Sequence, residues 1–327
     1  MLPSLVRKMV CCSVQTGNLL KKGYRTRSNF NRQRRLELFC SELKRQARVY
    51  EKKVEKVFWT IESEADSDPV KVLMNRNIST YRDCMKHISR LKADRMALAY
   101  ANGSYKSVLE KLSGNGKMTP LDYKCQNKHH ANAVNMVAYW RTCAFLLGAV
   151  IDRAFAVDVQ LVGPSKVDYH SGRFEYIARI ENQENWTPNS ENLFALTEKA
   201  IGEYIAKPLV VEPLLVSLEF AVDLFDSNVW KQKLVHEVKH ETEDGKQGVI
   251  IYRMGDFVDL TYGPLIPHTS HIDKFALTKV EQEGSEYCFV GVSVPKELKC
   301  SSYSWDLICN ASVMPPVKRR KLLEAFI

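Results

Sequence analysis

The segment His236-Glu237-Val238-Lys239-His240 fits the pattern H-E-x-x-H, in which two imidazoles hold a zinc ion and the glutamate acts as general base. That chemistry requires a helix, where residues four apart lie on one face. The flanking sequence predicts two strands instead, because Asp244-Gly245 is typical of a turn and residues 248–252 form a β-rich run. On a strand the two histidines would lie roughly 13 Å apart, at ~3.3 Å per residue. We therefore do not expect a zinc peptidase.

The other histidines also lack the spacing of a metal site. His129 and His130 are adjacent and point in different directions in any regular structure, while His268 and His271 lack a third ligand nearby. We interpret the second pair as surface or RNA-proximal residues. The sequence contains no C-x-x-C pair, no G-x-x-x-x-G-K-[ST] and no G-x-G-x-x-G. We expect no metal, no cofactor and no small-molecule substrate.

The charge of the chain is concentrated at its beginning. The 327 residues carry a net charge of +9, and nine of the 47 basic residues, but no acidic residue, lie within residues 1–36. The remaining 38 basic residues equal the 38 acidic ones. An Arg-rich, acid-free start is typical of a mitochondrial transit peptide, with a disordered RNA-binding arm as the alternative.

Composition narrows the class of protein further. At 45% hydrophobic residues, the chain can bury one large core or two modest ones. Nine scattered cysteines favour a reducing compartment such as the mitochondrial matrix. No apolar run reaches the ~18 residues that a spanning helix requires, so we expect a soluble protein without a membrane partner.

The order of patterns along the chain predicts an α+β fold with two modules. We expect a transit peptide or basic arm at 1–36, a charged helix and linker at 37–65, a small β-grasp-like module at 66–130, a larger α+β domain at 131–300 and a basic tail at 301–327. The predicted helices are 37–58, 81–92, a deeply buried one from Val134 to Phe155, 190–206 and 213–227. The predicted strands are 70–74, 96–101, 275–280 and 287–294, with a tight turn at Asn102-Gly103.

Charge also separates the two modules. Residues 66–130 carry twelve basic and six acidic residues, whereas residues 131–317 carry sixteen and twenty-five. An anionic partner such as RNA should prefer the first module, where Arg82, Lys86 and Arg90 would share one helix face. The basic tail could lie along phosphates or act as a nuclear localisation signal. The cations that we expect at an RNA backbone are Lys44, Arg45, Arg48, Lys52, Lys53, Lys56, Arg82, Lys86, Arg90, Lys318, Arg319, Arg320 and Lys321.

Three stretches carry a resemblance to a known family. They are Leu73-Met74-Asn75-Arg76-Asn77-Ile78-Ser79-Thr80, Ala138-Tyr139-Trp140-Arg141-Thr142-Cys143-Ala144, and Gly255-Asp256-Phe257-Val258-Asp259-Leu260-Thr261-Tyr262-Gly263-Pro264-Leu265-Ile266-Pro267. Together they resemble the family of mitochondrial large-subunit ribosomal protein thirty-nine, which is similar to the N-terminal half of threonyl-tRNA synthetase. Over residues 37–300 the resemblance implies a TGS module followed by an editing-type domain.

The resemblance also implies that the editing chemistry is lost. In the synthetase that pocket uses an H-x-x-x-H pair and a C-x-G-P-H segment, and the corresponding positions here hold Arg141, Phe145, Thr261 and Leu265. Arginine does not release its proton in proteins, and Phe and Leu have none to exchange. The chain also ends before an aminoacylation domain would begin, so we expect neither hydrolysis nor tRNA charging.

We therefore expect a non-catalytic structural component of the mitochondrial large ribosomal subunit, located in the matrix. Its partners would be large-subunit rRNA, contacted at phosphates, and neighbouring ribosomal proteins, contacted by the acidic domain. Two alternatives remain open at this point. One is a trans-editing aminoacyl-tRNA hydrolase, and the other is a matrix RNA-binding protein outside the ribosome.

Overall fold

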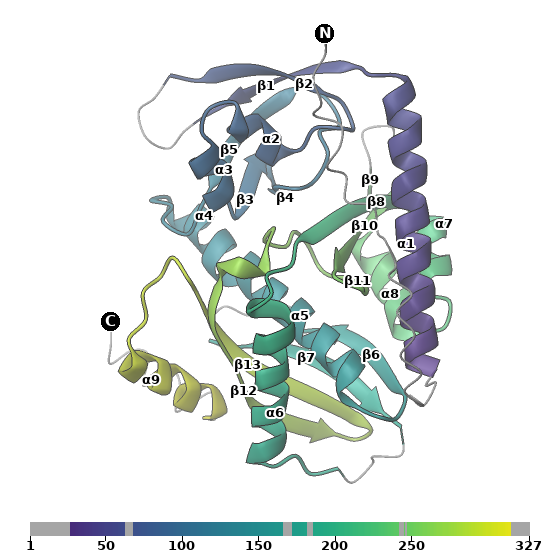
Figure 1. The fold of residues 1–327 in the computed structure, drawn as a ribbon, viewed down its shortest axis with the longest axis vertical. Coiled ribbons are helices and arrows are strands. Elements are labelled where there is room, and N and C mark those ends of the chain that lie inside the picture. Colours follow the sequence, from purple (N-terminus) through teal and green to yellow (C-terminus); the bar gives the residue numbers. More distant parts are fainter. Residues whose placement is uncertain are drawn as a thin grey trace.

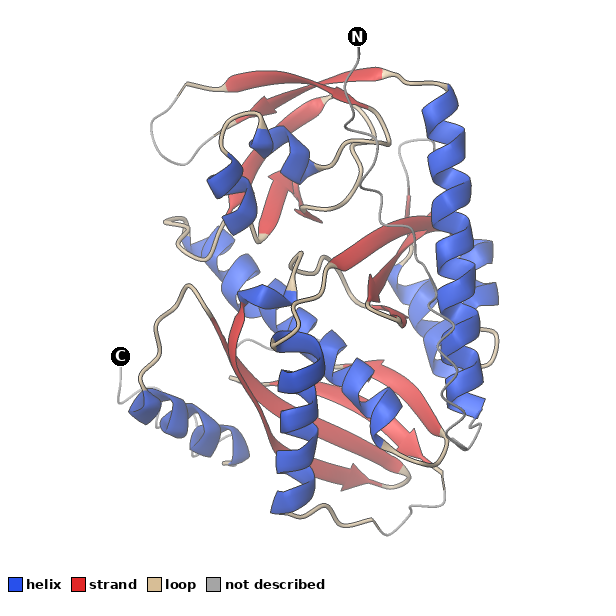
Figure 2. Cartoon of the chain, viewed as in Figure 1, coloured by secondary structure: helices blue, strands red, loops and turns tan. Residues whose placement is uncertain are grey.

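The computed structural model describes residues 27–62, 68–165, 172–181, 186–241, 245 and 247–314. Over these residues the protein is a mixed α+β structure with three sheets, and a long helix runs along one side (Figures 1 and 2). The transit peptide predicted at the N-terminus lies mostly outside the described residues, as does the basic cluster of the tail.

The first sheet is mixed and has the order β2-β1-β5-β3-β4. Its strands are β1 (Lys56–Ile61), β2 (Val70–Asn75), β3 (Leu98–Ala101), β4 (Ser104–Ser107) and β5 (Gly116–Leu121). β1 and β5 are parallel, and the other pairs are antiparallel. The short helices α2 (Tyr81–Lys86) and α3 (Arg90–Arg95) contribute buried residues to the same core. Asn102 and Gly103 make the β3–β4 turn with φ angles of 46° and 83°, a region that glycine and asparagine tolerate best.

A buried helix leads into the second half of the protein. It starts as α4 (Lys128–Asn132), continues through a π-helical segment at Ala133–Ala138 and ends as α5 (Tyr139–Ala154). α5 and α6 (Ser190–Ala200) lie against an antiparallel sheet of order β12-β13-β7-β6. Its strands are β6 (Val159–Pro164), β7 (Phe174–Ile180), β12 (Ile272–Glu283) and β13 (Glu286–Pro295). The helix α9 (Ser302–Val313) packs on β12 and β13.

The remaining strands form a smaller sheet between the other two. In it β10 (Gln247–Met254) pairs with β11 (Phe257–Leu260), β8 (Val211–Ser217) and the short β9 (His240–Glu241). α7 (Leu218–Leu224) and α8 (Val229–Val238) pack beside it. Because Leu98 and Leu121 of the first sheet belong to the largest buried cluster, together with residues of α5 and β10, the core continues from one half of the protein into the other.

The long helix α1 (Arg27–Lys52) is held to the second half by polar contacts and by one fully buried ring. Phe39 is 0% exposed and packs among side chains of β10 and β11. Arg32 Nη1 lies 3.0 Å from Asp152 Oδ2 of α5, and Arg35 Nη2 lies 3.9 Å from Asp152 Oδ1. Ser28 Oγ accepts a hydrogen bond from the Val159 amide at 2.8 Å. α1 is therefore a fixed part of the structure from its first turn.

A second buried charge pair lies beside Asp152. Lys231 of α8 is 0% exposed, and its Nζ donates to Asp259 Oδ2 at 2.6 Å and to the Tyr176 hydroxyl at 3.0 Å. The Tyr176 hydroxyl donates to the same Asp259 oxygen at 2.7 Å. Burial lowers the pKa of Lys231, while the charge of Asp259 opposes that change. A buried cation is tolerated only with such partners, so these three side chains fix α8, β11 and β7 relative to one another.

Most predicted elements of regular pattern are confirmed. These are the strands at 70–75 and 98–101, the Asn102-Gly103 turn, the deeply buried helix α5, the helix from Ser190 and the paired strands β12 and β13. The seven cysteines within the described residues are free thiols. The combined helix from Lys128 to Ala154 has the length and hydropathy of a membrane span, but 82% of its apolar window is buried inside the protein.

The boundaries at the start of the chain differ from the prediction. α1 begins at Arg27, so the last ten residues of the predicted presequence are helical and packed. The same helix ends at Lys52 instead of continuing to residue 58, because Val57, Trp59 and Ile61 alternate inward as the strand β1. The first sheet therefore starts at Lys56, ten residues before the predicted module boundary at 66.

Three other predicted elements are wrong. The helix 81–92 is broken into α2 and α3, because Ser89 caps a new helix by accepting a hydrogen bond from the Lys92 amide. The helix 213–227 is the strand β8 followed by α7. The first strand of the predicted pair, from Leu234, is wrong, because α8 continues to Val238 and only His240–Glu241 is extended. The second strand, at 248–252, is confirmed as part of β10, which pairs with β9. The predicted tail contains the helix α9, which no pattern had indicated.

The buried pair Lys231–Asp259 generates a stability prediction. Lys231→Met leaves the Asp259 carboxylate buried without its cation, and we expect the free energy of unfolding to fall by about 3–5 kcal/mol. Urea unfolding at pH 7, followed by tryptophan fluorescence, measures the change. The double variant Lys231→Met/Asp259→Asn removes both charges and should recover most of the loss. A single variant as stable as wild type would contradict the role assigned to this pair.

Candidate functional site

The four positions expected from the resemblance come together in the structure. Arg141 and Phe145 lie one turn apart on α5, and Thr261 and Leu265 flank the turn after β11. Arg141 Nη1 donates to the Pro264 carbonyl at 3.0 Å. A side chain at Gly263 would approach Arg141 Nη1 to 2.8 Å, so glycine at this position leaves room for the guanidinium.

Two of the four positions, Phe145 and Leu265, are filled by packed apolar side chains. Phe145 is 1% exposed and makes edge-to-face contacts with Tyr252 and Phe257, whose ring centroids lie 6.3 and 5.1 Å away. Leu265 is 0% exposed. Burial lowers the pKa of Arg141, yet a guanidinium still carries its proton at neutral pH. Three of the four positions therefore supply packing or a fixed positive charge, without a group that exchanges protons.

The turn itself is fastened to α5 by one hydroxyl. Thr142 Oγ1 donates to the Ala138 carbonyl at 2.8 Å and accepts from the Ile266 amide at 3.0 Å. Thr261 is 3% exposed, and its Oγ1 makes no hydrogen bond within the described part of the chain. A threonine hydroxyl becomes a nucleophile only beside a base, and the neighbouring positions hold Arg141 and Leu265. The other three positions therefore bring no base to the Thr261 hydroxyl.

A cavity of about 280 Å³ lies next to these residues, between the first sheet and the loop that follows β11. Tyr105, Lys106 and Glu110 line it from the first sheet, and Glu237 and His240 line it from the region of α8 and β9. Burial raises the pKa of Glu110 to about 7 and lowers that of His240. Glu110 Oε1 accepts from the Ser107 amide at 2.7 Å, so this carboxyl also closes the turn after β4. Glu110 and His240 are 130 residues apart, and nothing in the sequence predicts that they line one cavity.

The histidine motifs do not form a metal site in the described residues, where no group of three His, Cys, Asp or Glu side chains could hold an ion. His236 lies in the last turn of α8 and His240 in β9, with an extended Lys239 between them. The two imidazoles therefore do not stack on successive turns of one helix. The prediction of an extended pair was wrong, and helix termination at Val238 separates them instead.

His271 was interpreted as a surface or RNA-proximal residue, and this is wrong. Its Nδ1 lies 3.0 Å from the Tyr123 hydroxyl, and burial lowers its pKa to about 4. The preceding His268 is half-buried and forms a β-bridge with Val210. His130 is likewise engaged, with its Nδ1 3.1 Å from the Tyr105 hydroxyl. The contacts of His271 with Tyr123 and of His130 with Tyr105 support packing between the two halves of the protein.

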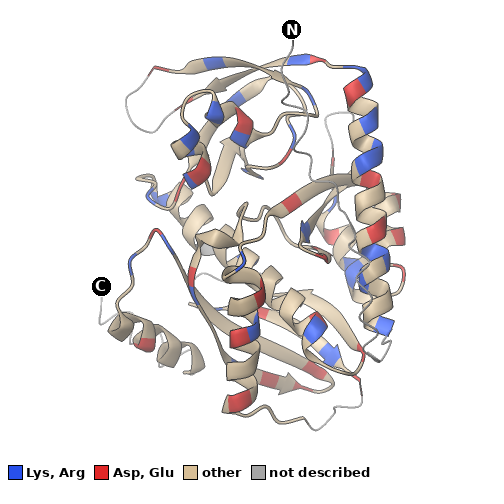
Figure 3. Cartoon of the chain, viewed as in Figure 1, with Lys and Arg blue, Asp and Glu red and all other residues tan. Residues whose placement is uncertain are grey.

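The cations in the C-terminal half of α1, from Lys44 to Lys52, lie on its exposed face. Ser41, Lys44, Arg45, Arg48, Val49 and Lys52 follow helical spacing and line a single surface hollow. Figure 3 shows the corresponding basic bands along the part of α1 that approaches β1. Arg45 is bound to Glu42 at 2.6 Å, which also lowers the pKa of Glu42. Lys44, Arg48 and Lys52 are exposed and make no ion pair with the described residues. We define these three as the α1 cation set.

The other predicted RNA contacts are less available. Lys53 pairs with Glu55 at 2.9 Å, and Lys56 donates to Asn75 Oδ1 at 2.6 Å. Arg82 pairs with Asp94 at 2.5 Å and Lys86 with Asp83 at 2.8 Å.

Arg90 is exposed but lies on α3, so the stripe of Arg82, Lys86 and Arg90 on one helix does not exist. The apolar Ile88 and Leu91 beside these cations are 41% and 62% exposed. Lys318, Arg319, Arg320 and Lys321 lie outside the described residues.

His271 and Glu110 lie where the first sheet meets the second half of the protein, and they should give opposite pH dependences of stability. Folded His271 binds fewer protons than the unfolded chain between pH 4 and 6.5, so its contribution to stability rises with pH. Folded Glu110 binds more protons than the unfolded chain between pH 4.5 and 7, so its contribution falls with pH. Each contribution changes by about 3 kcal/mol across its full window.

Urea unfolding between pH 4.5 and 7 separates the two contributions. Relative to wild type, Glu110→Gln should gain more stability as pH rises, and His271→Asn should gain less. Identical pH slopes for wild type and both variants would contradict the assigned pKa directions.

Comparison with known proteins gives a match along nearly the whole chain. No protein-family model matches it. The chain is 29% identical over 310 residues to "Large ribosomal subunit protein mL39" of Drosophila melanogaster, and the alignment covers 90% of each protein. The likeness to threonine–tRNA ligases is partial. The chain is 24% identical over 207 residues to a probable cytoplasmic threonine–tRNA ligase of Dictyostelium discoideum, and this alignment covers 26% of that enzyme. It is 32% identical over 141 residues to the threonine–tRNA ligase of Nitrosococcus oceani, and this alignment covers 20% of that enzyme.

Proposed function

We propose that this protein is a structural, non-catalytic component of the large subunit of the mitochondrial ribosome, located in the matrix. The observation that carries the proposal is the likeness to a large-subunit ribosomal protein over 90% of both chains. The partners that follow are large-subunit rRNA and neighbouring ribosomal proteins. The synthetase likeness covers 26% and 20% of the two ligases, and it supports a shared architecture of this part without a shared reaction.

We further propose that the first sheet is a TGS-like β-grasp module and that the second half is an inactive relative of the synthetase editing domain. The mixed five-stranded sheet with parallel β1 and β5 supports the first assignment. The meeting of α5 with the turn after β11, at Arg141 and Gly263, supports the second. The TGS-like module would begin at Lys56, and α1 would be an added helix that connects both parts.

The proposed mechanism at RNA is electrostatic. The α1 cation set presents three charges at successive turns of a rigid helix, and each can replace a counterion at a phosphate. Such contacts position a protein on RNA without reading its sequence. The inner side of α1 is fixed through Arg32, Arg35 and Phe39, so its outer side keeps one orientation.

Neutralising the α1 cation set tests this contact. We expect the variant Lys44→Gln/Arg48→Gln/Lys52→Gln to be released from the mitochondrial large subunit at a lower salt concentration than wild type, because it loses up to three phosphate contacts. Sucrose-gradient sedimentation of mitochondrial lysate at increasing KCl measures release. The control Lys207→Gln/Lys233→Gln/Lys239→Gln removes three exposed charges from the second half and should behave as wild type. Equal release of both variants would argue against RNA contact through α1.

The trans-editing alternative predicts hydrolysis of mischarged threonine tRNA. We expect the purified protein to release amino acid from seryl-tRNA at the uncatalysed rate, because Arg141, Phe145 and Leu265 cannot move protons. A deacylation assay with radiolabelled seryl-tRNA, with an active editing domain as positive control, measures this. Turnover above background that is lost in Thr261→Val would reverse the assignment.

A further inference from the structure

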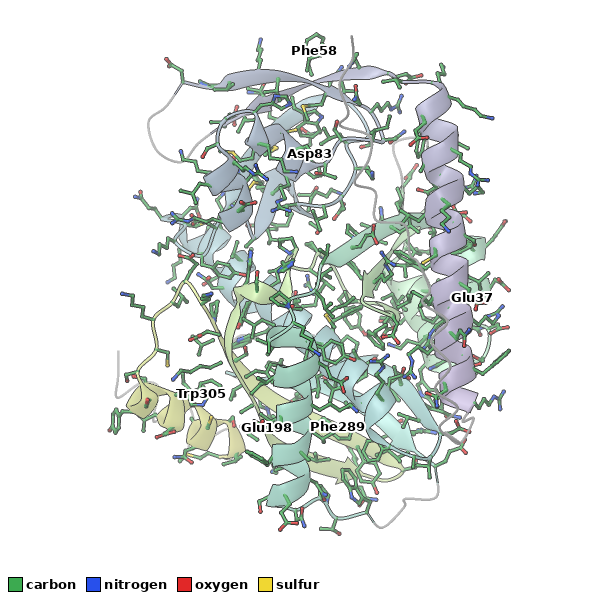
Figure 4. All side chains as sticks on the ribbon, in the orientation of Figure 1. Glu37, Phe58, Asp83, Glu198, Phe289 and Trp305 are labelled. Atoms are coloured by element: carbon green, nitrogen blue, oxygen red, sulfur yellow. The ribbon has the colours of Figure 1, made fainter. Side chains whose placement is uncertain are left out.

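One face of the first sheet is open and carries an exposed aromatic ring. Phe58 of β1 is 61% exposed, and Leu73 lies directly opposite on β2 with 50% exposed. Their neighbours Trp59 and Val72 point to the other side of the sheet and are buried. Figure 4 shows Phe58 at the outer margin of the first sheet, directed away from the protein. More than half of the Phe58 side chain is therefore left uncovered by the described residues.

The same face is covered only at its far end. Tyr100 of β3 and Tyr105 of β4 lie with ring centroids 5.2 Å apart, and the His130 ring is 4.9 Å from that of Tyr100. Leu98, two residues before Tyr100, is 1% exposed within the largest core. The β3–β4 end of the face therefore packs against the second half of the protein. Over the described residues, the β1–β2 end stays open.

Three lysines surround the exposed ring. Lys56 precedes Phe58 by two residues and so lies on the same face. The register places Lys71 of β2 and Lys117 of β5 on either side of Thr60, the next residue of β1 on that face. All three lysines are exposed. Lys117 pairs with Glu62 at 3.0 Å, and Lys71 makes no ion pair with the described residues.

We propose that this surface, formed by Phe58, Leu73, Lys56, Lys71 and Lys117, binds single-stranded RNA by stacking an unpaired base on the Phe58 ring. Exposed aromatic residues on a sheet, with cations at their border, are a recurrent solution for unpaired bases, because every base offers a π-face and every linkage a phosphate. The centre of a protein interface, by contrast, is depleted of lysine. The charge of this surface thus favours RNA over a protein segment.

The surface extends the RNA contact proposed for α1, and it rests on that proposed function. α1 ends at Lys52 and β1 begins at Lys56, so the helix leads directly into the open face (Figure 1). Duplex phosphates at the α1 cation set and an unpaired nucleotide at Phe58 could then belong to one segment of RNA. A helix and an aromatic platform in this order would recognise a junction between paired and unpaired RNA.

Binding of short RNAs to the purified full-length protein tests the stacking contact. The probes are fluorescein-labelled oligoadenylate and a duplex RNA of equal length, measured by fluorescence anisotropy at fixed salt. Phe58→Ala should weaken oligoadenylate binding by about five- to a hundredfold, the range found for loss of one stacked base. Phe58→Tyr keeps a ring and should bind as wild type, and binding of the duplex should change less than twofold in either variant. The matched control Phe194→Ala removes another ring that is 66% exposed, on α6, and should change nothing.

A spectroscopic readout separates stacking from general damage. With 2-aminopurine in the oligonucleotide, wild-type protein should quench its fluorescence, and Phe58→Leu, which keeps an apolar side chain, should not. Equal oligoadenylate affinity of Phe58→Ala and wild type would overturn the proposal. If that variant bound RNA normally but no longer sedimented with the large subunit, the face would be a protein-docking surface, which also overturns it. Failure of wild-type protein to sediment with the large subunit would instead contradict the proposed function, whatever the RNA assay shows.

Discussion

The arrangement of the protein depends on a carboxylate buried in the last turn of the apolar helix α5. Asp152 of α5 is 5% exposed, and it is held by Arg32 and Arg35 from the first turns of α1. Burial raises the pKa of Asp152, and the two guanidinium groups oppose that rise. The pair Lys231–Asp259 lies near enough for the charges of the two groups to influence one another. Because each buried charge requires its partner, α1, α5, α8 and β11 have one compatible arrangement.

This constraint gives the two sides of α1 different tasks. Its inner side supplies Arg32, Arg35 and Phe39 to the interior. Its outer side carries the α1 cation set, which makes no ion pair with the described residues. At the other end of α5, the side chains of Arg141 and Phe145 join this helix to β11 and to the turn that follows it. Side chains that fill space and fix charge suit a protein that holds its shape inside a larger particle.

Elements could be predicted from the sequence where the spacing of apolar residues was regular. α5 shows apolar residues on every side, and β13 is an apolar run that is buried from Phe289 to Pro295, so both were found. The failures occurred where the deciding contact was distant. Arg32 and Arg35 belong to an acid-free leader by composition, and only Asp152, more than a hundred residues away, makes them part of the interior. Lys231 gave no sign of burial, since its partners come from β7 and β11.

Local chemistry explains the smaller errors. Pro213 begins an apolar run that resembles a helix start, yet β8 is an edge strand, where a residue without an N–H is tolerated. The cap at Ser89 was visible in the sequence and was overlooked. At the candidate site Arg141, Phe145, Thr261 and Leu265 could be named from the resemblance. The cavity that Glu110 and His240 share could not be predicted, because it forms only through folding.

The central claim is that the outer face of α1 lies on rRNA, and site-specific cross-linking tests it most directly. A photoreactive phenylalanine analogue in place of Val49, which is 52% exposed among the α1 cations, leaves every charge intact. After irradiation of purified mitochondrial large subunits, the account predicts a covalent adduct to large-subunit rRNA. An adduct only to protein, or the absence of this chain from the large subunits, would contradict it.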